Sequence, residues 1–175
     1  MRRQVNAVAV LAVTALVTAG CSQTVQGSAA RAHEVSDQDR SYGYVDDRCG
    51  LLQDSTVQQD LGADKVVRPY SGAVCQYVLS RQQLMVDVTF SWFETGTLDR
   101  ERALAHDRGA EITDTVVERH PAFLARRATM GPSCSATAAA GQGVLTWWVQ
   151  FRAQTADDPC GDARKLLSST LSSSM

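Results

Sequence analysis

The sequence predicts an α+β domain in which helices pack on an antiparallel sheet, in the order α-β-β-α-β-β-β-β-α. Three patterns support this fold class. Apolar and polar residues alternate from Leu84 to Trp92, as in a strand with one face in the core. A second alternating run, 144–152, follows a glycine-containing turn at 141–143 and indicates a hairpin. Apolar residues at helical spacing follow Asp158-Pro159, a typical helix start.

The first predicted helix is short. Asp54-Ser55-Thr56 supplies N-cap candidates, and Gly62 suits the position after the last turn. Between these ends, Val57 and Leu61 are expected to face the core. The helix should therefore lie on the sheet by one side only.

A pair of strands and a second helix are expected next. The strands cover 75–79 and 84–92, with a turn at 81–83. The helix covers 98–108 and is closed by Gly109.

Four more strands and the last helix complete the domain. Two shorter strands, 113–117 and 123–128, flank a loop at His120-Pro121. The hairpin then pairs 134–140 with 144–152. The last helix places one stripe of residues toward the core: Cys160, Ala163, Leu166, Leu167, Thr170 and Leu171.

The N-terminus has the features of an export signal. Met1-Arg2-Arg3-Gln4 is a charged start, and 5–17 is an apolar run broken only by Asn6 and Thr14. A membrane-spanning helix needs about 20 apolar residues, so this run fits a signal peptide better than a transmembrane anchor. Residues 1–20 are therefore predicted to be a lipoprotein signal peptide.

The residues that follow resemble the bacterial lipobox, in which small residues precede a cysteine that receives diacylglycerol. Ala19, Gly20 and Cys21 match it, whereas Thr18 stands where leucine is usual. The alternative is an ordinary secretory peptide with a chance cysteine. A diacylglyceryl group together with an N-acyl chain such as palmitate anchors a protein stably. The predicted location is the outer face of the cell membrane, with the lipid at Cys21 as the link to the membrane.

A tether is predicted between the anchor and the domain. Residues 22–41 contain no large apolar side chain except Val25 and Val35, so they cannot bury enough surface to offset the entropy of ordering. We therefore expect a lipidated, flexible segment over 21–44 and an α+β ectodomain over 45–175.

Four cysteines remain in the ectodomain, and an oxidising compartment favours disulfides between them. Sequence alone permits three pairings. We favour Cys49 with Cys75 and Cys134 with Cys160, because each closes a moderate loop, which contributes about 3 kcal/mol. A metal site is disfavoured because paired ligands such as C-x-x-C do not occur, and the same spacing excludes thioredoxin-like redox chemistry.

The charge balance argues against nucleic acid as a partner. Lys plus Arg number 17 and Asp plus Glu number 19, and loss of Arg2 and Arg3 with the signal leaves 15 basic against 19 acidic side chains. Such a chain has no basic stripe that could neutralise phosphates. The cluster Arg119, Arg126 and Arg127 could touch anionic headgroups, although scattered surface charge is the favoured interpretation.

No constellation of nucleophile, base and orienting group occurs in a recognisable order, so the protein is not predicted to be an enzyme, and no cofactor is expected. Gly131-Pro132-Ser133-Cys134 is not a nucleophile elbow. His120 could act as a general base, but a surface loop histidine is the favoured interpretation.

Two aromatic residues interrupt otherwise polar strand faces. Trp148 shares its face with Gln150 and Arg152, and Phe93 follows Ser91 on its own strand. Either the last helix covers Trp148, or it lines a groove. Trp148 and Phe93 are thus the candidate ligand-binding residues, and a second layer of core beneath helices is the alternative.

Several short stretches together resemble a known family. They are Cys49-Gly50-Leu51-Leu52, Leu61-Gly62, Cys75-Gln76-Tyr77, Ser91-Trp92-Phe93-Glu94, Asp99-Arg100-Glu101-Arg102 and Asp158-Pro159-Cys160. In these stretches the chain resembles the actinobacterial cell-envelope lipoproteins of unknown function typified by the mycobacterial LprB and LprC pair. The resemblance implies a lipid-anchored envelope protein with an α+β fold similar to PsbP and Mog-like lipoprotein domains, and no established activity.

Two functions are compatible with these expectations. The first is a non-catalytic binding module that holds an apolar envelope molecule or a partner protein. The alternative is an accessory or scaffold subunit of a membrane transport or cell-wall assembly complex.

The lipobox interpretation predicts the behaviour of Cys21→Ala. Without a thiol to modify, the variant should either leave the membrane fraction or accumulate with its signal attached, because neither acyl group can be added. Fractionation and intact-mass measurement check this. A variant that is cleaved and still membrane-bound would contradict the interpretation.

Overall fold

A computed structural model describes residues 37–128 and 130–173, and it has the predicted α+β class. In this part of the chain there are nine strands and three helices. The helices are α1 (Asp54–Asp60), α2 (Leu98–Asp107) and α3 (Pro159–Ser172). The strands are β1 (Tyr44–Val45), β2 (Arg48–Cys49), β3 (Lys65–Tyr70), β4 (Val74–Arg81), β5 (Leu84–Phe93), β6 (Glu111–Val117), β7 (His120–Ala128), β8 (Pro132–Ala140) and β9 (Gly143–Phe151).

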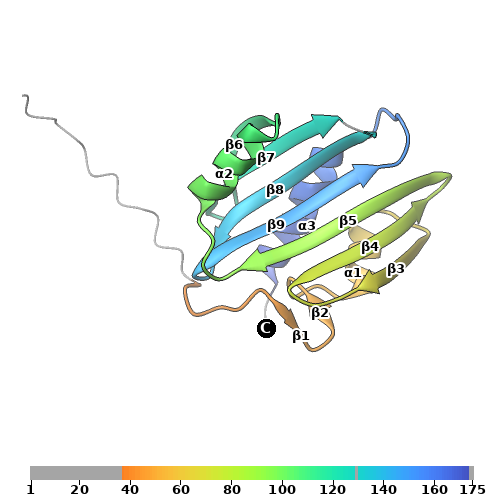
Figure 1. Cartoon of the computed structure of the whole chain (residues 1–175). Helices are drawn as coiled ribbons and strands as arrows, with labels where there is room; N and C mark the ends of the chain where they lie inside the picture. Colours follow the sequence, from red (N-terminus) through yellow and green to blue (C-terminus); the bar gives the residue numbers. More distant parts are fainter. Residues whose placement is uncertain (1–36, 129, 174–175) are drawn as a thin grey trace, which may run out of the picture. The chain divides into compact units, whose positions relative to one another are not determined.

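Seven of the described strands form one antiparallel sheet in the order β3-β4-β5-β9-β8-β7-β6. The chain builds one half with β3 to β5, crosses through α2 to the far edge at β6, and returns strand by strand to β9 (Figure 1). As a result, β5 and β9 are neighbours at the centre of the sheet although α2 and three strands separate them in sequence.

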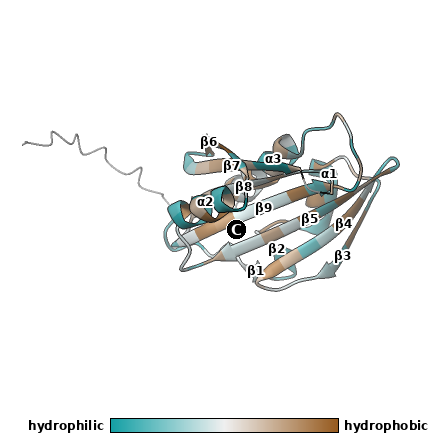
Figure 2. Ribbon diagram, turned by 45° about the horizontal axis from the view of Figure 1, so that its top comes forward, coloured by the Kyte–Doolittle hydropathy of each residue, from teal (hydrophilic) through white to brown (hydrophobic). Residues whose placement is uncertain are grey.

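The two faces of the sheet are covered differently. In Figure 1, α3 lies behind the sheet and α2 in front of it. The face toward α3 is the main core, where Trp147 is fully buried and its indole N–H donates to Thr170 Oγ1 at 2.9 Å. Val57 and Leu61 of the α1 region join the same core, as predicted. Bands of hydrophobic and hydrophilic residues alternate along the central strands, which gives each strand one core face (Figure 2).

The sequence patterns missed three strands. The edge strand β3 has no alternation of apolar and polar residues, because Val66 and Val67 are adjacent and Pro69 follows. An edge strand tolerates such a sequence since one side of its backbone has no partner. β1 and β2 have two residues each, which is too short for a periodic signal.

Two turns lie elsewhere than predicted. His120-Pro121 belongs to β7 rather than to a loop, and the turn is formed by Glu118 and Arg119, both with positive φ. This is the backbone geometry of a tight two-residue hairpin turn. In the hairpin of β8 and β9, Gly143 pairs with Ala140, so the turn is shorter than 141–143.

The first helix begins one residue earlier than its expected caps. Gln53 occupies the N-cap position and its side chain makes no capping hydrogen bond, while Asp54 is already in the first turn. Gly62 follows the helix with φ +59°, as expected for the residue after the last turn.

The packed domain begins before the predicted boundary at residue 45. Tyr42 is fully buried, its hydroxyl donates to the carboxylate of Asp37, and Arg40 donates to the carbonyl of Ser173. Residues 37–44 therefore pack on the domain rather than belong to a flexible tether. The predicted signal, Cys21 and the rest of the predicted tether lie outside the described residues. Within the described residues, no helix is long and apolar enough to cross a membrane.

Both disulfides form with the predicted pairing, Cys49 with Cys75 and Cys134 with Cys160. The first joins β2 to β4, and the second joins β8 to the first turn of α3. Because each links an element outside the main sheet to a strand inside it, the disulfides fasten the N-terminal segment and the last helix to the sheet.

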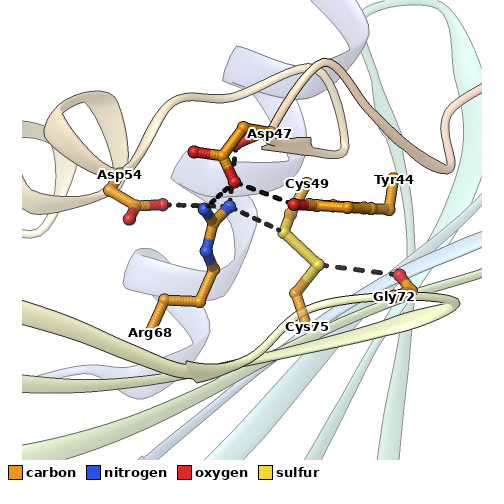
Figure 3. The surroundings of a disulfide bond; sticks show 7 residues. All are labelled: Tyr44, Asp47, Cys49, Asp54, Arg68, Gly72 and Cys75. Carbon is orange, nitrogen blue, oxygen red and sulfur yellow. Dashed lines mark hydrogen bonds and ion pairs between the residues drawn. A yellow bond between two sulfur atoms is a disulfide. The ribbon is translucent and has the colours of Figure 1, made fainter.

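Arg68 organises the surroundings of the first disulfide (Figure 3). Its side chain is only 9% exposed, and its guanidinium donates to the carbonyl of Asp47 at 2.8 Å and lies 3.3 Å from the carboxylate of Asp54. Tyr44 donates to the Asp47 carboxylate at 2.8 Å. These contacts hold the β1-β2 segment and the start of α1 beside Cys49.

Asp158 is the N-cap of α3, as the sequence predicted. Its carboxylate accepts from the backbone N–H groups of Cys160 at 3.1 Å and Gly161 at 3.0 Å, and from Arg126 at 2.9 Å. Partial burial would raise the pKa of this carboxyl, but the bonds from Arg126 and the two backbone groups outweigh it and lower the pKa.

We expect Cys134→Ser and Cys160→Ser to lose the same free energy of unfolding, about 3 kcal/mol each, because each removes the same loop constraint. The double variant should be no less stable than either single variant. Denaturant unfolding of the oxidised proteins measures this, and additive losses would contradict the pairing.

Asp158→Ala should lower the free energy of unfolding by about 1 kcal/mol at pH 7, because the N-cap bonds are lost. The pKa of Asp158 is lower in the folded protein than in the unfolded chain, so its stabilisation is present above about pH 4 and disappears as the pH falls through the folded pKa. Unfolding curves at several pH values check this. Asp158→Asn should retain most of the N-cap hydrogen bonds. If the difference in unfolding free energy between Asp158→Ala and wild type grew as the pH falls, the predicted direction of the pKa shift would be wrong.

Candidate functional site

The candidate site is a groove between α2 and the sheet face opposite α3. The cavity has a volume of about 580 Å³, and its lining comes from α2 and from β5, β7, β8 and β9. We call it the α2 groove. Small-molecule sites in proteins have volumes of roughly 300 to 1,000 Å³, so the space is of the right size for one ligand.

The groove exists because α2 is only loosely seated on the sheet. Leu98 and Ala105 pack on a small cluster around Phe123, yet no residue of α2 is fully buried. Arg102 holds the helix on its β6 side, since its guanidinium is paired with Asp114 and lies 5.2 Å from the centre of the Phe123 ring. The other long side of the helix is left open over β8 and β9.

The floor of the groove is made of short side chains. Ser91, Thr146 and Thr137 lie in one row across β5, β9 and β8, and Phe123 on β7 continues this row. In the next row, Ser135 lies beside Trp148. Thr137 and Thr146 share a hydrogen bond of 3.0 Å between their hydroxyls. Because these side chains are small, the sheet does not fill the space beneath α2, and several hydroxyl groups face the cavity.

Trp148 and Phe93 both line the groove. α3 covers the opposite face, so it does not cover Trp148, which is half-buried, and Phe93 is 47% exposed. The close approach of β9 to Phe93 requires a glycine, because a Cβ on Gly143 would lie 2.0 Å from the Phe93 carbonyl oxygen. The two aromatic residues that interrupted polar strand faces are therefore brought to one cavity, and whether they bind a ligand stays a prediction.

The charged residues of the groove were not predicted as site residues. Arg100 and Glu101 come from α2, Arg108 directly follows that helix, and Arg127 comes from β7. One signal could have found part of this set: Arg100, Leu104 and Arg108 are four residues apart and share one side of a helix.

The basic cluster considered in the sequence does not stay together. Arg126 points to the other face of β7 and pairs with Asp158, whereas Arg127 lines the groove. Arg119 lies in the β6-β7 turn and borders a separate hollow near Asp37. Adjacent residues of a strand point to opposite faces, which explains the separation of Arg126 from Arg127.

His120 is buried, contrary to the favoured interpretation of a surface loop histidine. It is 7% exposed at the start of β7, with Nδ1 2.8 Å from the carbonyl of Ala139 and Nε2 3.9 Å from the carboxylate of Asp37. A carbonyl only accepts, so Nδ1 carries the proton. The ring thus links β7 to β8 and lies close to the N-terminal segment.

The described residues can be searched for a reactive thiol and for a metal-binding cluster. All four cysteines between residues 37 and 173 are in disulfides, so that part of the chain offers no free thiol. In the same part, no three His, Cys, Asp or Glu side chains gather in a way that could hold a metal ion.

The comparisons with known proteins agree with the resemblance in the sequence. A curated protein of Mycobacterium leprae named "Putative lipoprotein LprB" is 24% identical over 137 residues, which cover 76% of this chain and 73% of the relative. No solved structure matches the chain significantly, so the PsbP and Mog-like architecture stays a prediction. The model of the family DUF3558, a family of proteins of unknown function, matches residues 16–173. This chain therefore belongs to the DUF3558 family, and its relatives include a protein named as a lipoprotein.

Proposed function

We propose that the protein is a lipid-anchored cell-envelope lipoprotein whose ectodomain is a non-catalytic binding module. The α2 groove is the observation that carries this proposal. It is a cavity of about 580 Å³ on a face of the sheet that α3 does not cover, and Trp148, Phe93 and Phe123 are among its lining residues.

The location is supported by three features of the chain. A relative named as a lipoprotein aligns with 76% of the chain, and the sequence around Cys21 resembles a lipobox. The packed domain already includes Asp37, so Cys21 and the domain are close in sequence. In this proposal, lipid on Cys21 holds the protein at the outer face of the cell membrane. Residues 22–36 would then separate the domain from the lipid surface.

The kind of ligand follows from the walls of the groove. Trp148, Phe93 and Leu104 offer apolar surface, while the floor offers hydroxyl groups. Mixed walls of this sort suit an envelope molecule with a large apolar part and a few polar groups. The similarity to PsbP and Mog-like domains implied by the sequence belongs to this proposal as well.

A scaffold role in a membrane complex is the second candidate, and a different surface favours it. Tyr70 is 57% exposed and Val67 49% exposed on the edge strand β3. Tyr44 and Val45 of β1 are also exposed, and Arg68 lies 5.7 Å from the centre of the Tyr44 ring, which places β1 near β3. An exposed apolar group on a sheet edge is a site where a partner protein can dock.

The test uses mature protein purified from its native envelope in a mild detergent. Native mass spectrometry should show a bound envelope lipid, beyond the covalent anchor, on the wild-type protein. Ser135→Trp should lose that adduct, because the larger ring fills the groove beside Trp148. Gln76→Trp is the matched control, since Gln76 is exposed on β4 outside the groove, and it should retain the adduct.

The opposite result would favour the scaffold role. Wild-type protein free of any adduct, together with one dominant crosslinked partner in cells that is lost in Tyr70→Ser, would contradict the binding module. The Tyr70→Ser change is suitable because this side chain is largely exposed and its loss leaves the core intact.

A further inference from the structure

We propose that the α2 groove binds a lipid with an anionic headgroup, with the headgroup between Arg108 and Arg127 and the apolar chain along Trp148 toward Phe93. This inference rests on the proposed binding function, and it adds the chemical class of the ligand and its direction in the groove.

The connectivity places Arg108 and Arg127 at the same end. Helix α2 starts shortly after Phe93 and ends beside Arg108, and β6 follows almost at once with Glu111. Glu111 pairs with Arg126, the neighbour of Arg127 on β7. The end of α2 and the end of β7 thus meet, and Phe93 lies at the opposite end of the groove.

The arginines of the groove form no salt bridge with any residue that the structure describes. In the described residues, no carboxylate lies within salt-bridge distance of Arg100, Arg108 or Arg127. Six other arginines of that part are paired with acidic side chains: Arg48, Arg68, Arg81, Arg102, Arg126 and Arg152. Two cations at one end of a cavity repel each other, and an anion between them would replace that repulsion with charge-assisted hydrogen bonds.

The two ends of the groove differ in net charge. At the start of α2, Arg100 is followed by Glu101, and both line the groove, so their charges offset each other. At the other end, Arg108 and Arg127 have no acidic residue among the groove lining. Asp107 is close in sequence, but its carboxylate lies 3.6 Å from His106 and does not line the cavity. The anionic group should therefore bind at the Arg108 end.

An apolar path leads from the charged end to the aromatic end. Arg127 is in register with Ser133 and Gln150, so Trp148 lies one row further along the sheet. Val144, the partner of Phe93, lies two rows beyond Trp148. At about 3.4 Å per residue, the path from the Gln150 row to the Phe93 row is about 20 Å long. Such a length suits an extended chain better than a compact ligand.

The charge of the whole chain selects against larger anions. Formal charges sum to −2, and loss of the predicted signal makes the sum more negative. A polyanion would meet repulsion outside the groove, whereas a single headgroup touches only the two arginines. Hydroxyls of Ser135, Thr137 and Thr146 can donate to the ester or phosphate oxygens of the same ligand.

The experiment measures quenching of Trp148 fluorescence by bromine-tagged probes, using the mature lipoprotein in neutral detergent. The bromine-tagged probes are bromodecyl phosphate and bromodecanol. Inorganic phosphate, which carries no bromine, is measured by its displacement of bromodecyl phosphate. Bromine quenches on contact, Trp147 is fully buried on the opposite face, and Trp92 does not line the groove. Trp148→Phe should therefore remove the quenching, which identifies the signal. Bromodecyl phosphate should bind at least about tenfold more tightly than bromodecanol, as expected for charge-assisted hydrogen bonds.

Substitution of the arginines tests the headgroup site. Arg108→Gln with Arg127→Gln should reduce the advantage of bromodecyl phosphate over bromodecanol to about twofold or less, and should leave bromodecanol binding unchanged. Arg164→Gln is the matched control, because Arg164 is exposed on α3, across the sheet from the groove. Far-UV circular dichroism confirms that each variant is folded.

The outcomes separate this inference from the proposed function. If neither chain-bearing probe quenches Trp148, the binding function itself fails and this inference fails with it. If bromodecyl phosphate and bromodecanol bind equally and the double variant changes neither affinity, the groove binds a ligand but the assignment of an anionic headgroup is wrong. If inorganic phosphate binds as tightly as bromodecyl phosphate, the site takes a free anion and the lipid assignment is overturned.

Discussion

The pairing of β5 with β9 is the contact on which the rest of this domain depends. It joins residues far apart in sequence, so its loop-closure entropy must be offset by the packing that it creates. Its register puts Phe90 opposite Trp147, with ring centres 5.0 Å apart, on the face toward α3. The same register puts Thr89 opposite Trp148 on the face toward α2. A slip of one residue would exchange the two faces, and both the core and the groove would be lost.

Helices α2 and α3 lie on opposite faces of this sheet and have different roles, because they are held in place differently. α3 is held by a disulfide, by a capped first turn and by a stripe of buried side chains, so it packs firmly on its face of the sheet. α2 has a cap at Thr97 and contacts beside β6, but no fully buried residue. A helix with little buried apolar surface opens locally at low free-energy cost. The same lack of burial that makes α2 weakly held leaves the space in which a ligand can lie.

Small side chains on β8 contribute to the groove as much as the helix does. The strand contains only Pro, Ser, Cys, Ala and Thr. On one face these short side chains let Trp147 and α3 pack closely, and on the other face they leave space beneath α2. Patterns such as the alternation in β5 and the capped start of α3 were strong enough to predict these elements. β3 escaped prediction because an edge strand needs no alternation. His120 was misplaced because its burial depends on Ala139 and Asp37, which are distant in sequence.

By itself, the sequence determined the fold class, most elements and the core face of the two strands with clear alternation, β5 and β9, because these follow from local periodicity and capping. It also favoured the local disulfide pairing among the three that four cysteines allow, and that pairing is the one that forms. Only the tertiary structure decided which face of the sheet each helix covers. Because α3 lies on the opposite face, Trp148 lines a cavity. The tertiary structure also decided that Arg108 and Arg127 share one end of that cavity. Their meeting follows from a crossover that carries the chain from β5 to the far edge of the sheet, and no local pattern encodes the direction of such a crossover.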